Sequence, residues 1–152
     1  MEAISQPAPF NVLLADDDID DCGFFEEALL NFPLATNYNC VHNGEQLMNL
    51  LAGNEAVLPH VIFLDLNMPR KNGFECLEEI MLHSRLKLIP IIIYSTSLEK
   101  EVVNKLFMNG ARYFIRKPSD FSKFIEIIQQ ALMLVYKNNT SHPLIEDFIL
   151  TV

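Results

Sequence analysis

Five short apolar runs, each followed by a helix-like segment, constrain the fold of this chain more than any other feature. They are continuous rather than alternating, which is typical of strands buried on both faces. Strands that alternate with helices predict a parallel sheet covered by helices on both sides. We therefore expect an α/β fold with a doubly wound, five-stranded parallel sheet. Its strands are predicted at residues 11–15, 38–41, 61–64, 91–94 and 113–115.

The segments between these runs carry helix patterns and helix stop signals. Gly110 suits the left-handed cap that ends the fourth helix. Residues 1–137 are predicted to form one domain, with an N-terminal extension at residues 1–9. Residues 138–152 form a short tail that either packs on its own domain or supports a homodimer. Helices are predicted at residues 19–30, 45–51, 73–83 and 98–109, with a last one that begins near residue 119 or 120.

Charge excludes several classes of partner. The 152 residues include 20 acidic and 11 basic side chains, a formal net charge of -9. This balance argues against sequence-independent binding of nucleic acid, which needs basic surface, and equally against an anionic membrane surface. No apolar stretch approaches the roughly 20 residues of a spanning helix, and residues 1–10 lack a signal-peptide pattern. We expect a cytoplasmic protein.

The three cysteines are scattered along the chain. Cys22, Cys40 and Cys76 are an odd number and contain no CxxC pair. In a cytoplasmic protein this pattern predicts reduced thiols rather than a disulfide framework or a zinc site.

Polar side chains follow the strands where a ligand would bind. In an open parallel sheet, ligands bind beyond the carboxyl ends of the strands. The fold would therefore bring carboxylates, a hydroxyl and an ammonium group from distant parts of the chain to one edge. The residues at these strand ends are Asp16, Asp17 and Asp18, then Asp65, Ser95 and Lys117.

Carboxylates packed this closely repel one another unless a proton or a cation lies among them. Mg²⁺ suits such a set of oxygen ligands, and Asp17 and Asp65 could bind it directly, with Asp16 acting through a water. The Asp65 carboxylate could then attack a phosphoryl group. Lys117 would offset the charge on the phosphoryl oxygens, and Ser95 would donate a hydrogen bond to one of them.

Four motifs in the expected order resemble the receiver domain of two-component response regulators. The similarity extends from about residue 11 to residue 136. The motifs are Leu-Leu-Ala-Asp-Asp-Asp ending at Asp18, Phe-Leu-Asp-Leu-Asn-Met-Pro ending at Pro69, Pro-Ile-Ile-Ile-Tyr-Ser-Thr ending at Thr96, and Tyr-Phe-Ile-Arg-Lys-Pro ending at Pro118.

The resemblance implies a flavodoxin-like sheet with strand order 2-1-3-4-5. It implies that Asp65 accepts a phosphoryl group from a sensor histidine kinase or a phosphotransfer histidine. Mg²⁺ would be bound by Asp17, Asp65 and the main-chain carbonyl of Asn67. A cis bond before Pro118 would aim Lys117 inward. We expect no turnover of an external substrate, only self-phosphotransfer and autodephosphorylation.

The resemblance also implies how a signal leaves the domain. Ser95 would move toward the phosphoryl group, and the aromatic ring of Phe114 would swing inward with it. The face formed by the fourth helix, the fifth strand and the last helix would then change its affinity for a downstream protein. The chain resembles stand-alone, single-domain regulators of the kind paired with bacterial phytochromes.

Three other functions remain to be distinguished. An EF-hand-like calcium loop is disfavoured because Asp21 stands where that loop needs glycine. Asp16 and Asp18 supply the Asp-x-Asp pattern of a haloacid-dehalogenase-like phosphatase. A phosphorylation-independent binding module would keep the same pocket without using it.

Overall fold

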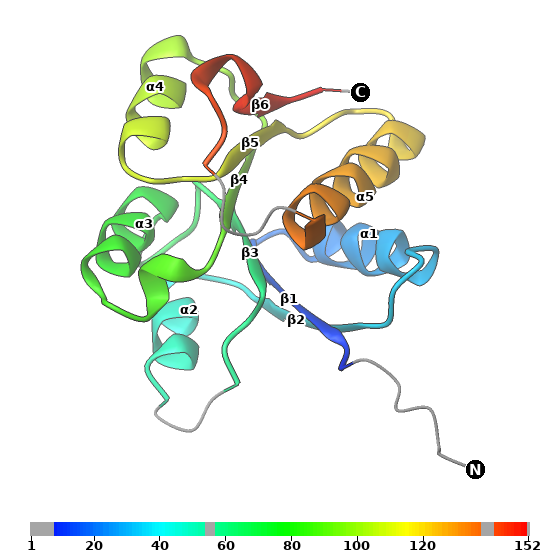
Figure 1. Ribbon diagram of the computed structural model, residues 1–152, viewed down its shortest axis with the longest axis horizontal. Helices are drawn as coiled ribbons and strands as arrows, with labels where there is room; N and C mark the ends of the chain where they lie inside the picture. Colours follow the sequence, from blue (N-terminus) through cyan, green and yellow to red (C-terminus); the bar gives the residue numbers. More distant parts are fainter. Residues whose placement is uncertain (1–7, 54–56, 138–141, 152) are drawn as a thin grey trace.

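The computed structural model describes residues 8–53, 57–137 and 142–151. Its strands form one parallel sheet in the order β2-β1-β3-β4-β5-β6 (Figure 1). The elements are β1 (Phe10–Ala15), α1 (Ile19–Leu30), β2 (Thr36–Val41), α2 (Gly44–Leu51), β3 (Val61–Asp65), α3 (Gly73–Leu82), η1 (Leu86–Leu88), β4 (Ile91–Ser95), α4 (Lys100–Met108), β5 (Tyr113–Arg116), α5 (Phe121–Lys137), η2 (Ile145–Asp147) and β6 (Ile149–Leu150).

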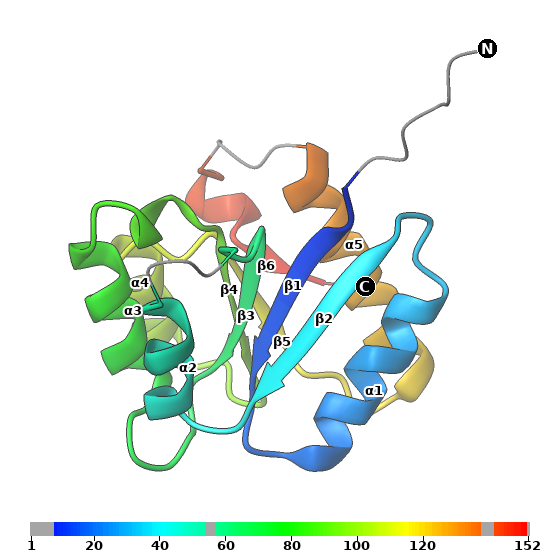
Figure 2. The ribbon, with the colours of Figure 1, turned by 90° about the horizontal axis from the view of Figure 1, so that it is seen from below.

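Helices cover both faces of the sheet. Helices α1 and α5 lie on one face, and α2, α3 and α4 lie on the other (Figures 1 and 2). The central strands β3 and β4 are buried along their whole length, which explains their continuous apolar sequence. Alternate strand residues therefore enter two separate cores, as Phe63 does on the α1 and α5 side and Leu64 on the other. No helix in the described ranges is long and apolar enough to cross a membrane.

The predicted doubly wound fold and its strand order 2-1-3-4-5 are confirmed, but the sheet has six strands rather than five. The extra strand β6 extends the sheet beside β5, in parallel. A two-residue strand is too short to show any periodicity, so the tail gave no strand signal. Of the predicted tail, residues 138–141 and 152 lie outside the described residues.

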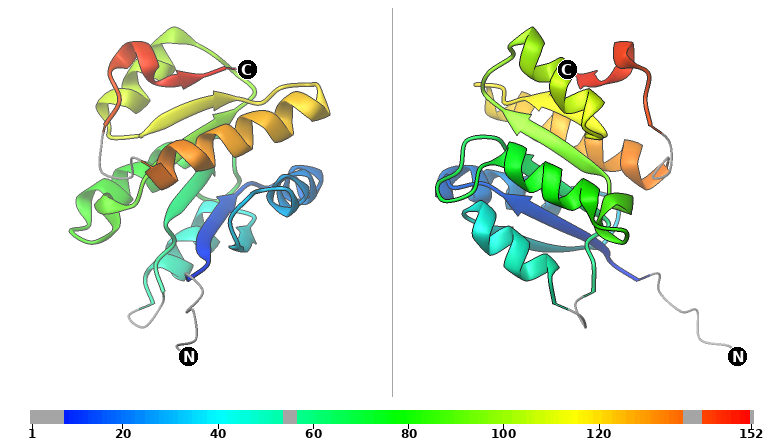
Figure 3. Two further views of the ribbon diagram at one scale, coloured as in Figure 1. Left: turned by 45° about the vertical axis from the view of Figure 1, so that its right-hand side comes forward. Right: turned by 90° about the vertical axis from the view of Figure 1, so that its left-hand side faces the viewer.

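The C-terminal segment is anchored by one aromatic side chain. Phe148 is fully buried, and its carbonyl accepts a hydrogen bond of 2.9 Å from the main-chain N–H of Phe114. Its ring lies 5.2 Å from the ring of Phe107 and 6.4 Å from that of Phe114, measured between centroids. Figure 3 shows the segment along the β5 edge of the sheet, next to α4.

Replacing this anchor is expected to destabilise the whole domain. Phe148→Ala removes a fully buried ring and leaves a cavity, which typically costs about 3–5 kcal/mol. The free energy of unfolding, measured by urea denaturation followed by circular dichroism, should fall by that amount. Ile145→Ala changes a side chain that is 45% exposed on the same segment, so it should cost less than about 1 kcal/mol. Equal effects of the two variants would contradict the anchoring role.

Candidate functional site

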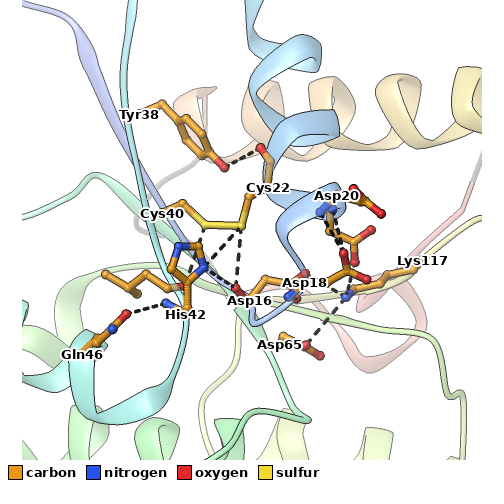
Figure 4. The surroundings of a disulfide bond; sticks show 12 residues. Asp16, Asp18, Asp20, Cys22, Tyr38, Cys40, His42, Gln46, Asp65 and Lys117 are labelled. Atoms are coloured by element: carbon orange, nitrogen blue, oxygen red, sulfur yellow. Dashed lines mark hydrogen bonds and ion pairs between the residues drawn. A yellow bond between two sulfur atoms is a disulfide. The ribbon is translucent and has the colours of Figure 1, made fainter.

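Four strands deliver charged and polar side chains to the carboxyl edge of the sheet. Asp16 follows β1, Asp65 ends β3, Ser95 ends β4 and Lys117 follows β5. Asp16 and Ser95 are almost fully buried, and Asp65 is 5% exposed. The Lys117 Nζ lies 2.9 Å from Oδ2 of Asp16 and 3.7 Å from Oδ2 of Asp65 (Figure 4). Residues up to 101 positions apart thus meet in one buried charge cluster.

Lys117 has two further neighbours that the sequence did not indicate. Oδ2 of Asp21, in the first turn of α1, accepts a second hydrogen bond of 2.9 Å from Nζ. The ring of Tyr94 lies beneath the ammonium group, with 4.2 Å from Nζ to the ring centroid. Such a cation–π contact is strongest where water is excluded. The ammonium is therefore held between carboxylates and an aromatic face.

Three carboxylates are close enough to share one cation. Asp16, Asp17 and Asp65 each offer an oxygen within 4.8 Å of the others, and Asp17 is exposed to solvent. Carboxylate oxygens with one open side fit Mg²⁺, which keeps several waters. The main-chain N–H of Asn67 donates a 3.3 Å hydrogen bond to Oδ1 of Asp65. The role of the Asn67 carbonyl as a metal ligand stays a prediction.

The loop after Asp65 depends on a glycine. A Cβ at Gly73 would collide with the main-chain oxygen of Asp65 and would lie 2.8 Å from Cα of Leu66. The Gly73 N–H instead donates a 3.0 Å hydrogen bond to the Leu66 carbonyl. Arg70, in the same loop, has a φ of 68° in the left-handed region. The chain therefore folds back tightly against the end of β3 and contacts the main chain of Asp65 and Leu66.

Burial and nearby charges shift the pKa values of the groups in this cluster in opposite directions. Burial raises the pKa of Asp16 to about 7, against hydrogen bonds from the Asp18 N–H and Lys117 that lower it. Burial also raises the pKa of Asp65 above its usual range. Burial alone would lower the pKa of Lys117, but the hydrogen bonds to Asp16 and Asp21 raise it above its ordinary value. The ammonium thus stays charged beside carboxylates that hold protons unusually tightly.

The two predicted switch residues, Ser95 and Phe114, have different surroundings. Ser95 follows Tyr94, which pairs with Asp65 across the sheet, and its Oγ accepts a 3.3 Å hydrogen bond from the Ser97 N–H. Phe114 is fully buried and belongs to the core on the α4 side, where it meets Phe148. The inward position of Phe114 is a fact of this structure, whereas its role as a switch stays a prediction.

The local structure argues against the calcium and phosphatase alternatives. The Asp18 carboxylate accepts hydrogen bonds from the Asp20 and Asp21 main-chain N–H groups and so caps α1 rather than joining the cluster. Helix α1 begins at Ile19, directly after β1 and three aspartates, so a 12-residue calcium loop does not form. An Asp-x-Asp nucleophile pair would need both Asp16 and Asp18 in the site.

Two smaller predictions about this region are wrong. The described residues contain no cis peptide bond, so the bond before Pro118 is trans, and Lys117 nevertheless reaches the acids. Cys22 and Cys40 form a disulfide, whereas only Cys76 is free. The separation of 18 positions between the paired cysteines carries no spacing signal, because the contact depends on α1 lying against β2.

The fold and this cluster together define a class of protein, and comparison with known sequences agrees. A family model described as the response regulator receiver domain matches residues 12–129. The chain therefore belongs to the response regulator receiver domain family. It is 23% identical over 125 residues to the probable methanogenesis regulatory protein FilR2 of Methanothrix harundinacea, a match that covers 80% of this chain and 81% of that one. The regulatory protein AtoC of Escherichia coli is 29% identical to this chain, in a match that covers 63% of this chain but only 20% of AtoC.

Solved structures show the same fold. The phosphorylated cyanobacterial phytochrome response regulator RcpA superimposes with a TM-score of 0.79 at 28% identity, over 90% of this chain and 100% of that one. The Mn²⁺-bound response regulator Rcp1 gives 0.78 at 24% identity, also over 90% and 100%. The bacteriophytochrome response regulator RtBRR gives 0.67 at 29% identity, over 78% and 75%.

The raised pKa of Asp16 predicts how stability depends on pH in buffer without divalent cations. The folded protein binds this proton more tightly than the unfolded chain, whose pKa is 3.8. The stability that Asp16 contributes is therefore fully present below about pH 3.8 and is lost as the pH rises through about 7. Between about pH 4 and 7, Asp16→Asn should gain stability relative to wild type as the pH rises, by up to about 1.4 kcal/mol per pH unit.

This comparison is made by urea denaturation with a chelator at several pH values. Asp147→Asn, on the exposed surface of η2, is the matched control and should differ from wild type by a constant amount. A constant difference for Asp16→Asn as well would show that this carboxylate is not the group that titrates.

Proposed function

We propose that this protein is a phosphoryl acceptor of a two-component phosphorelay. Asp65 takes a phosphoryl group from the phosphohistidine of a sensor histidine kinase or a phosphotransfer protein, in a reaction that requires Mg²⁺. The observation that carries this proposal is the position of Asp65, a nearly buried carboxylate 3.7 Å from Lys117 and within 4.8 Å of Asp16 and Asp17. The phosphorylated form of the similar regulator RcpA supports it.

The chemistry is a transfer between two nucleophiles. An Asp65 carboxylate oxygen attacks phosphorus, the P–N bond of phosphohistidine breaks as the P–O bond forms, and the imidazole nitrogen keeps the electron pair. Lys117 offsets charge on the phosphoryl oxygens, and the Ser95 hydroxyl, once turned from Ser97, donates to one of them. Mg²⁺ held by Asp16, Asp17, Asp65 and the Asn67 carbonyl would supply Lewis-acid neutralisation of the same oxygens.

Return to the resting state needs only water. Attack of water on the acyl phosphate of Asp65 releases inorganic phosphate and restores the carboxylate. The protein therefore turns over no external substrate and acts as its own phosphoryl acceptor and phosphatase.

The output is a change of affinity for another protein. Movement of Ser95 toward the phosphoryl group would be coupled to Phe114 on β5, and the face formed by α4, β5 and α5 would shift between two states. In this chain β6 and Phe148 lie on the β5 side of that face, so the downstream protein target would meet the C-terminal segment as well. A homodimer at this face and a stand-alone role stay predictions.

The net charge of -9 supports a protein partner rather than nucleic acid or a membrane surface. We place the protein in the cytoplasm, where a kinase would draw its phosphoryl group from ATP.

The full chain should gain one phosphoryl group when it is incubated with Mg²⁺ and a small donor. Acetyl phosphate and phosphoramidate, which carries a P–N bond like phosphohistidine, are the donors, and intact mass is the measurement. The gain should disappear in Asp65→Asn, because an amide is no nucleophile here, and in buffer with excess chelator.

Two controls make this result specific. Asp147→Asn removes an exposed carboxylate far along the chain from the cluster and should be phosphorylated like wild type. The free energy of unfolding of Asp65→Asn should be measured in parallel, so that a folding defect is recognised. Absence of phosphorylation in the wild-type protein with both donors, or equal phosphorylation of Asp65→Asn, would overturn the proposal.

A further inference from the structure

The disulfide between Cys22 and Cys40 joins α1 to β2 beside the acidic cluster. Cys22 lies in the first turns of α1, and Cys40 lies near the end of β2, with 6.5 Å between their Cα atoms. Figure 4 shows the sulfur atoms, His42 and the main chain of Asp16 in one small region. Neither the proposed phosphoryl transfer nor the binding of Mg²⁺ uses these sulfurs.

The surroundings of the disulfide converge on the main chain of Asp16. Sγ of Cys22 lies 3.7 Å from the Asp16 carbonyl oxygen, and Nδ1 of His42 lies 3.2 Å from the same oxygen. The Asp16 main-chain N–H donates a 3.0 Å hydrogen bond to the Val41 carbonyl on β2. Because the carbonyl oxygen is within reach of Cys22 Sγ, a reduced thiol would find an acceptor there, and both oxidation states can be accommodated.

The disulfide is placed where small oxidants and reductants can reach it. Cys40 is partly exposed on β2, which is an edge strand of the sheet, and the neighbouring His42 is exposed. The remaining cysteine, Cys76, is fully buried in the other core and has no sulfur partner in the described part of the chain. Disulfides in cytoplasmic proteins are usually transient and redox-sensing rather than structural.

We propose that Cys22 and Cys40 are a reversible redox modification site that controls the acidic loop of residues 16–18. The oxidant is a peroxide. The more exposed Cys40 thiol attacks one peroxide oxygen, giving a sulfenic acid and one water from hydrogen peroxide. The Cys22 thiol then displaces the sulfenic hydroxyl as a second water and forms the S–S bond. A dithiol reductant returns both thiols by exchange and is itself oxidised to a disulfide.

The coupling follows from how the loop is attached. Its start is tied to β2 by the Asp16–Val41 hydrogen bond, and its end enters α1, which the disulfide also ties to β2 through Cys22. Closing the disulfide fixes both ends against one strand and preorganises the carboxylates of Asp16 and Asp17 for a divalent cation. This second half of the inference rests on the proposed function, whereas the redox chemistry does not.

Thiol counting tests the chemistry on the full chain. After peroxide treatment, denaturation and alkylation, the intact mass of wild type should show one alkylated thiol, and after dithiothreitol three. Cys76→Ser is the matched control and should show none and two. In Cys40→Ser, peroxide should leave both remaining thiols free for alkylation once any sulfenic acid is reduced by arsenite. Three alkylated thiols in peroxide-treated wild type, or a bond only between two chains, would overturn the proposal.

Cation affinity tests the coupling. The dissociation constant for Mn²⁺, measured by titration calorimetry, should rise about three- to tenfold when wild type or Cys76→Ser is reduced, because preorganisation is lost. In Cys40→Ser the constant should not depend on redox state. An unchanged constant in wild type would overturn the coupling. Stoichiometric Zn²⁺ binding by reduced wild type, lost in Cys40→Ser and blocking disulfide formation, would instead assign a metal site to Cys22, Cys40 and His42.

Failure of this inference can be separated from failure of the proposed function. If Asp65 is phosphorylated by acetyl phosphate but peroxide forms no bond between Cys22 and Cys40, the redox proposal alone is wrong. If the bond forms and opens reversibly but Asp65 is phosphorylated in neither redox state, the phosphorelay proposal alone is wrong.

Discussion

The charge of Lys117 is the constraint on which the rest of the site depends. Asp16 and Asp65 are carboxylates with almost no exposure to water, and burying such groups is costly unless an opposite charge compensates them. Among the described residues, Lys117 is the one ammonium group within 4 Å of both, and its contact with the ring of Tyr94 helps to hold it there. One cation facing several carboxylates leaves the cluster short of positive charge. Burial and that deficit together raise the pKa values of Asp16 and Asp65, and the deficit is the physical basis on which we propose a divalent cation and phosphoryl transfer at this site.

Whether a residue of the site could be predicted from the sequence depends on the element that positions it. Asp65, Ser95 and Lys117 were predictable because a parallel sheet aligns its strand ends, and the strand pattern is strong. Asp21 was not, because its contact with Lys117 depends on the angle at which α1 leaves the sheet rather than on a strand end. The Cys22–Cys40 pair was missed for a similar reason, since composition and compartment argued for free thiols. Two-residue β6 lacked any pattern to recognise.

The acidic loop is held from several sides at once. Asp18 caps α1, the Asp16 main chain contacts Val41 and His42, and the disulfide fastens α1 to β2. On the opposite side of the cluster, Gly73 allows the loop after Asp65 to fold back against β3. Mutual repulsion would otherwise spread these carboxylates apart. These main-chain contacts thus keep the acids together. A change that breaks one of them would alter the relative positions of the carboxylates.

Strand β5 connects this cluster to the C-terminal segment. Lys117 directly follows β5 and Phe114 is the second residue of this strand, so a displacement of β5 would be felt both by the acids and by the ring of Phe148. Phe148 is packed between Phe107 on α4 and Phe114 on β5, and close packing makes such aromatic contacts respond in discrete steps rather than gradually. Because β6 pairs directly with β5, the C-terminal segment forms this edge of the sheet. In the proposed function, a change at Ser95 or Lys117 would therefore reach a partner through residues 148–150 as well as through α4 and α5.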